Sequence, residues 1–217
     1  RWCDCMPKQH ALLNPSAAHR WLICTPSARL HAKLQDRLGE TESSFAKEGT
    51  LAHSLAELKL RLANDEINQF NFDQQRKQLG DIPKEMDRYT DVYVDTVLEK
   101  LYAAQKTCPD ARLFIEQRLD MSPWVPQCFG TSDAVIVSDQ TLEVCDLKYG
   151  KGIAVDAREN PQARLYALGA VNMFGEIYGF KHVRATIIQP RLDNISDEII
   201  SRTDLLWWGT EIRPAAM

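Results

Sequence analysis

Apolar residues recur with helical spacing in the first half of the chain. Leucines follow one another at intervals of four, three and four residues from Leu51 onward, which is the period of an amphipathic helix. This pattern predicts a helix over residues 48–63, with Thr50 as its N-cap and His53 in its first turn. Apolar side chains again keep to one side over residues 84–106, which predicts a second helix.

The regions around these helices are polar or rich in turn residues. Residues 64–84 are dominated by Asn, Gln and Asp and end in glycine and proline, which predicts a surface excursion. Residues 6–30 hold Pro15 and Pro26 among short apolar stretches. We therefore expect loops there, around one short helix over residues 17–23.

The middle of the chain changes from helical to strand patterning. Three short runs rich in β-forming residues are separated by turn residues, at 112–119, 131–137 and 141–148. Runs of this length and composition, so closely spaced, predict a β-meander in which successive strands pair.

A further helix and strand follow the meander. Asn160 precedes Pro161, an arrangement typical of an N-cap and the first helical residue, and apolar residues then keep to one face until about Tyr178. Residues 182–189 read as a fourth strand. The resulting order of helix, three strands, helix and strand predicts an α/β fold with a mixed central sheet flanked by helices.

Composition supports one globular core domain. The chain has 217 residues, of which 44% are hydrophobic and 26% charged, enough apolar mass for a real core. Its longest apolar runs, 134–137 and 205–208, fall far short of the ~20 residues that span a bilayer. The amino end lacks the apolar core of a secretory signal, so we expect a cytoplasmic protein.

Charge and boundaries refine this picture. The formal net charge of −4 excludes a global basic field, so a nucleic-acid enzyme would need a local basic groove.

We expect an N-terminal helical extension over 1–45, the core domain over 46–200, and the start of a truncated segment over 201–217. Residues 1–5 are expected to precede a natural start at Met6.

Three charged residues fall together at the end of the meander. Alternation along a strand puts Asp146 and Lys148 on one side, and Asp133 on the preceding strand can approach Asp146. Two neighbouring carboxylates repel unless a cation lies between them, and a hard divalent cation serves best. Taken singly, each aspartate could instead cap a turn, and the lysine could lie at a solvated edge.

The spacing of these residues resembles that of a nuclease superfamily. The segment from Gly130 to Asp133, followed after twelve residues by Asp146, Leu147 and Lys148, is similar to the PD-(D/E)XK motif. The resemblance implies a restriction-endonuclease-like core in which the two aspartates ligate Mg²⁺ or Mn²⁺. It also implies that the Leu147 carbonyl adds a ligand and that Lys148 orients or deprotonates the attacking water.

Two further elements look like the RecB-like exonuclease branch, including its phage- and prophage-associated members. The segment Gly49–His53 is similar to an element whose histidine is an extra metal ligand, although His53 could simply cap its helix. Gln162 and Tyr166 lie at i and i+4 on one helical face and match a Gln-x-x-x-Tyr element. That element implies contacts to Lys148 and the DNA strand, whereas Tyr166 could instead pack on the sheet.

More peripheral residues match less specifically. Glu116 falls at a frequent acidic position of the group, but it could equally pair with Arg118 or another base. Lys151, Arg158 and Arg164 follow the motif strand and could form a DNA-binding groove with salt-sensitive phosphate contacts. Interspersed acidic residues make a solvated face an equal alternative.

Cys24 is a candidate ligand of an iron–sulfur cluster. Several RecB-like proteins hold an iron–sulfur cluster with one early cysteine and three near the carboxyl end, and Cys24 lies where the early one would be. No cysteine follows Cys145, so a cluster would require a C-terminal segment in a longer chain. The alternative for Cys24 is a buried free thiol.

Together these features predict a metal-dependent DNA nuclease. We expect an exonuclease that uses Mg²⁺ or Mn²⁺ and acts in phage or prophage DNA recombination, replication or repair. Its partners would be a DNA single strand or duplex end and a recombination protein or further copies of itself. The alternative is a catalytically silent nuclease-fold module that binds DNA or a recombination partner.

Overall fold

The computed structural model describes residues 11–38 and 43–217, so the expectation for residues 1–5 lies outside the described residues. The helices are α1 (Ala18–Trp21), α2 (Pro26–Leu38), α3 (Ser44–Ala63), α4 (Gln69–Gln78), α5 (Lys84–Thr107), α6 (Pro161–Phe174) and α7 (Arg202–Ile212), with 3-10 segments η1 (Pro15–Ala17), η2 (Pro190–Leu192) and η3 (Arg213–Ala216). The strands are β1 (Arg112–Asp120), β2 (Phe129–Val137), β3 (Thr141–Leu147), β4 (His182–Gln189) and β5 (Asn194–Ser201).

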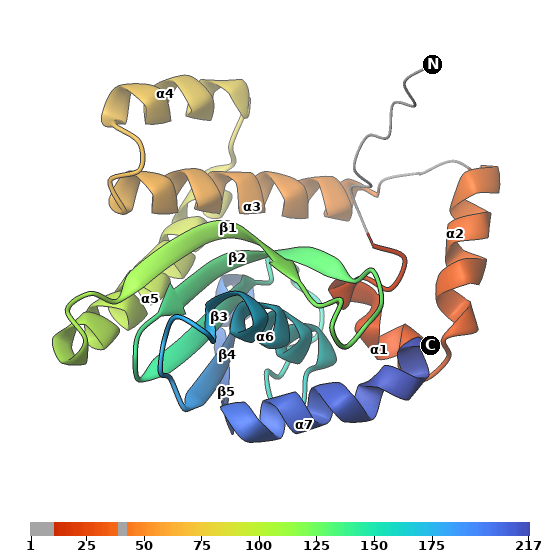
Figure 1. The fold of residues 1–217 in the computed structure, drawn as a ribbon. Helices are drawn as coiled ribbons and strands as arrows, with labels where there is room; N and C mark the ends of the chain where they lie inside the picture. The colour runs from red at the N-terminus through yellow and green to blue at the C-terminus, as the bar shows by residue number, and fades with distance from the viewer. Residues whose placement is uncertain (1–10, 39–42) are drawn as a thin grey trace, which may run out of the picture.

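One mixed sheet organises the chain, with its strands in the order β1-β2-β3-β4-β5 (Figure 1). The first three strands form the predicted antiparallel meander. β3 and β4 are parallel, and α6 is the crossover that a parallel pair requires. β5 adds an antiparallel edge strand beside β4. The predicted fold class, a mixed central sheet flanked by helices, is confirmed.

Helices cover both faces of this sheet (Figure 1). α6 packs on β1 to β4 on one face, whereas α3 and α5 pack on each other and cover the opposite face. Alternate residues of β3 divide between the two cores: Leu142 and Val144 join the α6 side, and Cys145 and Leu147 join the α3 and α5 side. α4 lies on the outside of α3 and buries none of its residues.

Both ends of the described chain contribute to the α6-side core. Trp21 of α1 and Leu205 of α7 are fully buried in the same cluster as the α6 residues. The indole Nε1 of Trp21 donates a hydrogen bond to the Asn14 carbonyl at 3.0 Å, so this large side chain is both packed and satisfied. Residues outside 46–200 therefore share one hydrophobic core with the predicted nuclease domain.

Several predicted element boundaries are wrong, for identifiable reasons. α3 begins at Ser44, because the Ser43 side chain accepts the Ala46 N–H and caps the helix; Thr50 lies inside it and donates to the Ala46 carbonyl. α2 occupies a segment predicted as loop, since Pro26 is its first residue rather than a breaker. The polar excursion contains a helix, α4.

The carboxyl-terminal elements also differ from expectation. α6 ends at Phe174 with Gly175 as C-cap, four residues before the predicted end at Tyr178. β5 and α7 were not predicted. Across residues 11–38 and 43–217, no helix combines the length and apolar character needed to cross a membrane.

Candidate functional site

The site forms where β2 and β3 separate. Their ladder runs from Val137↔Leu142 to Ala134↔Cys145 and stops there. Asp133 is the next residue on β2, and its Oδ2 accepts the backbone N–H of Leu147 at 2.7 Å. The carboxylate thus takes the place of a strand acceptor at the point where the strands part, which fixes Asp133 beside the end of β3.

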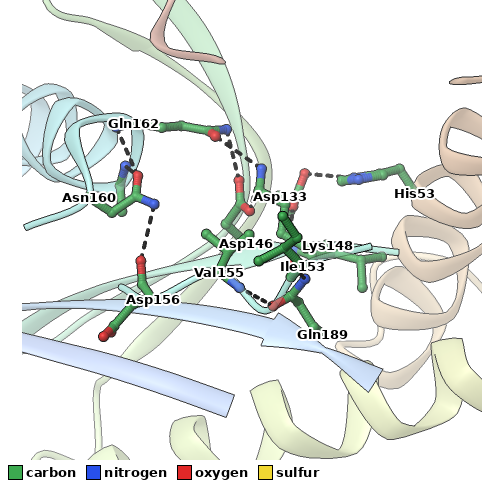
Figure 2. A network of polar contacts seen from close by, with 12 residues as sticks. His53, Asp133, Asp146, Lys148, Ile153, Val155, Asp156, Asn160, Gln162 and Gln189 are labelled. Carbon is green, nitrogen blue, oxygen red and sulfur yellow. Dashed lines mark hydrogen bonds and ion pairs between the residues drawn. The ribbon is translucent and has the colours of Figure 1, made fainter. Parts of the chain in front are cut away.

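Asp146, Lys148 and Gln162 form a closed polar triangle (Figure 2). Lys148 Nζ lies 2.8 Å from Asp146 Oδ2 and donates to Gln162 Oε1 at 3.0 Å. Gln162 Nε2 donates to Asp146 Oδ1 at 3.2 Å. The predicted contact between Gln162 and Lys148 is therefore confirmed.

Local sequence explains why Gln162 is available for this contact. Asn160 caps α6 by accepting the backbone N–H groups of Gln162 and Ala163, and Pro161 fixes the first helical residue. Gln162 therefore stands in the first turn, where α6 meets the end of β3. The side chain is half-buried and bridges the two charged residues.

His53 reaches the same cluster from α3 on the other side (Figure 2). Its Nδ1 lies 3.0 Å from Asp133 Oδ1. Burial lowers the pKa of His53, but the adjacent Asp133 carboxylate more than offsets this and raises the pKa to about 9. Because α3 begins at Ser44, His53 lies in the third turn and not the first, so it does not cap the helix.

The cluster brings two largely buried carboxylates, those of Asp133 and Asp146, close together. Burial raises the pKa of Asp146; the Lys148 ammonium opposes this shift, and the neighbouring Asp133 carboxylate adds to it. Asp146 Oδ2 is buried and faces the Lys148 ammonium at 2.8 Å. A buried carboxylate needs such a positive partner, so a metal ion bound by Asp146 would have to share this place with Lys148.

Glu116 belongs to this acidic cluster as well. The β1–β2 register pairs Ile115 with Ala134 and resumes at Gln117, which places Glu116 opposite Asp133. Its φ of 49° is left-handed, a conformation that costs energy for a residue other than glycine. Burial, followed by repulsion from Asp133, raises its pKa to about 7. The alternative pairing with Arg118 is wrong, since that guanidinium lies 4.1 Å from the Phe129 ring.

Tyr166 lies mainly in the core beneath the site. Only 8% of the residue is exposed, and its ring would lie 2.9 Å from a methyl group placed on Gly130. Burial, with the nearby Asp146 and Asp133 carboxylates, raises the pKa of its hydroxyl above the usual value. Tyr166 therefore packs on the sheet, and any contact with DNA is confined to a small part of the side chain.

The three predicted DNA-binding cations do not form one groove. Lys151 is exposed, with its Nζ 3.6 Å from Glu85, and Arg158 is exposed in the turn before α6. Arg164 is instead held by Glu198 of β5: its Nε and Nη2 donate to the two carboxylate oxygens at 2.8 and 2.5 Å. The Arg164 guanidinium is thus committed to Glu198 and largely enclosed, which does not favour the predicted phosphate contact; that contact stays a prediction.

Polar side chains that the sequence analysis missed hold the segment between β3 and α6 (Figure 2). Gln189 accepts the Val155 N–H at 2.6 Å and donates to the Ile153 carbonyl at 3.3 Å. Further along, Ser196 accepts the Ala157 N–H and Glu198 accepts the Glu159 N–H. Alternate polar residues of β5 thus fix this segment, a signal visible in the sequence once β5 is known.

The donor set suits Mg²⁺ or Mn²⁺, as the resemblance implies. Asp133, Asp146 and His53 offer two carboxylates and an imidazole, which are ligands for Mn²⁺, with Mg²⁺ preferring the oxygens. In this structure these three donor groups are not gathered within 4.8 Å of one another. Asp133 is paired with His53 and Asp146 with Lys148, so a metal would have to compete with both ion pairs.

Other metal-binding chemistry is weaker. Cys108, Asp110 and Asp139 do lie within 4.8 Å of one another, at the hairpin end of β2 and β3, but two exposed carboxylates and a thiol do not identify a cofactor. Cys24 is an exposed free thiol between α1 and α2, so the alternative of a buried thiol is wrong. Its role in an iron–sulfur cluster stays a prediction.

Comparisons with other proteins add a family and a structural similarity. The family model described as "Protein of unknown function (DUF2800)" matches residues 10–217. The chain is also similar to a solved structure titled "Crystal structure of SSO0001", at 15% sequence identity and a TM-score of 0.25, with 84% of this chain and 82% of that chain covered. Neither description names an activity.

Proposed function

We propose that this chain, which belongs to the DUF2800 family, is a metal-dependent deoxyribonuclease of the RecB-like kind. The observation that carries the proposal is the cluster at the separating ends of β2 and β3. There Asp133, Asp146 and Lys148 come together with Gln162 and His53. His53 contacts Asp133, while Lys148 and Gln162 contact Asp146. The Leu147 N–H joins the two groups by donating to Asp133, so the residues that the resemblance singles out lie in one cluster.

The chain's own groups have distinct tasks in phosphodiester hydrolysis. Asp133, Asp146 and His53 would hold the metal, which when bound supplies Lewis-acid stabilisation of charge on the phosphate and a more acidic water. Lys148 lies beside Asp146 and can hydrogen-bond the attacking water above the carboxylates. Gln162 holds the ammonium and the Asp146 carboxylate in a fixed relation, which preserves the geometry that attack requires.

The substrate and setting follow from the resemblance. We propose exonucleolytic action on a single strand or duplex end in phage or prophage DNA recombination, replication or repair, alongside a recombination protein or further copies of the chain. The described surface supports a local basic contribution from Lys151 and Arg158, both exposed near the site. It does not support one from Arg164.

The test is a cleavage assay with end-labelled DNA. The purified protein would be incubated with single- and double-stranded DNA, labelled at either end, in Mn²⁺, Mg²⁺ or EDTA, and product lengths followed over time. We expect loss of label in Mn²⁺ or Mg²⁺, none in EDTA, and none from Asp146→Ala, which should also lose metal binding. Cleavage that persists in EDTA or in Asp146→Ala would contradict the proposal.

A second candidate is a catalytically silent module. The observation that favours it is that His53 and Lys148 already pair with the two carboxylates, which reduces the need for a bound metal. A silent module would bind DNA equally well in EDTA and give no product in any metal, so the same assay separates the two functions.

A further inference from the structure

A pocket of about 580 Å³ lies beside the candidate site. It is lined by Phe45, Glu48 and Gly49 of α3, by residues 149–152 after β3, and by Arg191 of η2. This volume is within the range of about 300–1,000 Å³ that is typical of small-molecule sites. None of the residues that form the polar cluster around Asp133 and Asp146 lines this pocket.

The pocket adjoins the reacting groups along two elements. Gly49 stands one helical turn before His53 on α3. Tyr149 follows Lys148 directly in the chain. A DNA strand with one phosphate over the Asp133 and Asp146 carboxylates could therefore place a neighbouring nucleotide in the pocket. Neither α3 nor the segment after β3 would have to move.

Two aromatic side chains line the pocket, and the charged residues that line it form ion pairs. Phe45 is 81% exposed at the edge of the pocket, whereas Tyr149 is 5% exposed and lies under the Arg191 guanidinium at 4.7 Å. Arg191 is paired with Glu48 at 2.9 Å, and the nearby Lys151 lies 3.6 Å from Glu85. Because Arg191 is held by Glu48 and lies on the Tyr149 ring, it is not free to bind a phosphate, and the pocket suits a neutral planar group better.

Glycines keep the pocket open. A side chain at Gly49, Gly150 or Gly152 would meet nothing within 4 Å, and none of the three has a left-handed backbone. Glycine inside a helix is less favourable than alanine by about 1 kcal/mol, so Gly49 has no folding advantage over a larger residue. The absence of a side chain at Gly49 therefore leaves free volume beside the site.

We propose that this pocket binds one unpaired nucleobase of the DNA strand, stacked on Phe45, next to the scissile phosphate. The inference rests on the proposed nuclease function and adds to it a preference for single-stranded DNA at the site. An exposed aromatic ring offers stacking to any base, and such stacking raises affinity without sequence preference. A paired base could not enter, because its partner strand would have to follow.

The test uses short single-stranded oligonucleotides with one 2-aminopurine at each position in turn and a fluorescent label at one end. Binding would be measured in EDTA by anisotropy, and base stacking by 2-aminopurine emission. We expect the wild type to alter the emission at one or more positions. Phe45→Ala and Gly49→Leu, the second of which fills the pocket, should lose this change and bind roughly tenfold more weakly.

Controls keep the outcomes distinct. Phe70→Ala removes an aromatic ring that is 68% exposed on α4 and should behave as the wild type, and circular dichroism checks that all variants fold. Emission and affinity that are unchanged in Phe45→Ala and Gly49→Leu would overturn the pocket. If these variants lose stacking but the wild type cleaves no DNA in Mn²⁺, the base-binding pocket is supported and the nuclease function is contradicted. If the wild type cleaves DNA but neither variant changes emission or affinity, the nuclease function is supported and the pocket is contradicted.

Discussion

The pairing of His53 with Asp133 makes a quantitative prediction about protonation. Asp133 Oδ1 lies 3.0 Å from His53 Nδ1, and its charge outweighs burial in raising the pKa of His53 to about 9. Asp133→Asn removes that charge, while the amide oxygen can still accept the Leu147 N–H. With burial then dominant, the pKa of His53 should fall to 6.5 or below.

The size of this effect is easily measured. At pH 7.5, a pKa of about 9 leaves His53 protonated by roughly 30 to 1, whereas a pKa of 6.5 leaves it neutral by roughly 10 to 1. A raised histidine pKa stabilises the fold at pH values below the unfolded pKa, and that stabilisation is lost as the pH rises through about 9. Since 37% of the side chain is exposed, the consequence for stability is small and titration is the better measurement.

The assay is an NMR titration of the histidine ring protons in EDTA, with the His53 signal assigned from a His53→Asn variant. The chain has five histidines, and the other signals should not differ between the wild type and Asp133→Asn. Replacing EDTA with Mg²⁺ should lower the apparent pKa of His53, because a metal ligand must give up its proton. A wild-type pKa at or below 6.5, or no change in Asp133→Asn, would refute the assignment of this pair.

Two further predictions concern stability. Gly169→Ala should lower the free energy of unfolding by about 1–2 kcal/mol in a urea titration, because the new methyl would lie 2.8 Å from Leu119 Cβ and overpacking outweighs helix propensity. Gly49→Ala, where a methyl meets open space, should raise the free energy of unfolding by up to about 1 kcal/mol. Equal effects of the two substitutions would contradict the packing described at Gly169. Burial raises the pKa of Glu198, but hydrogen bonds from Arg164 more than offset this and lower it. The Arg164–Glu198 pair therefore stabilises the fold at pH values above the ordinary carboxyl pKa of 4.5, and this stabilisation is lost as the pH falls through the lowered pKa. Glu198→Gln should flatten the acid side of a curve of unfolding free energy against pH. An unchanged curve would count against this role of the pair.

Local patterns predicted the elements that carry their own signals. The meander and β4 match their predicted spans closely, because β-forming runs there are bounded by turn residues. The start of α6 was predictable from Asn160 and Pro161, which act as cap and first helical residue. α3 was found, but its start was placed too late because Ser43 and Thr50 are both good capping residues and only the fold decides between them.

What was missed depended on distant parts of the chain. β5 is a polar edge strand whose alternate side chains bind the segment before α6, so it lacks the apolar alternation that marks a strand. Missing β5 also meant missing Glu198, the partner of Arg164. The resemblance placed Asp133, Asp146 and His53 at one metal site, but it did not predict that Asp133 would contact His53 and the Leu147 N–H directly. The left-handed backbone of Glu116 had no signal in the sequence.

The most direct test of the central claim is the initial rate of Mn²⁺-dependent DNA cleavage by the wild type, Lys148→Ala and Lys106→Ala measured side by side. Lys106 is an exposed lysine in the last turn of α5 and makes no contact with the cluster around Asp146. We predict that Lys148→Ala lowers the rate by about 10²-fold or more while Lys106→Ala leaves it unchanged. Equal rates in the wild type and Lys148→Ala would contradict it.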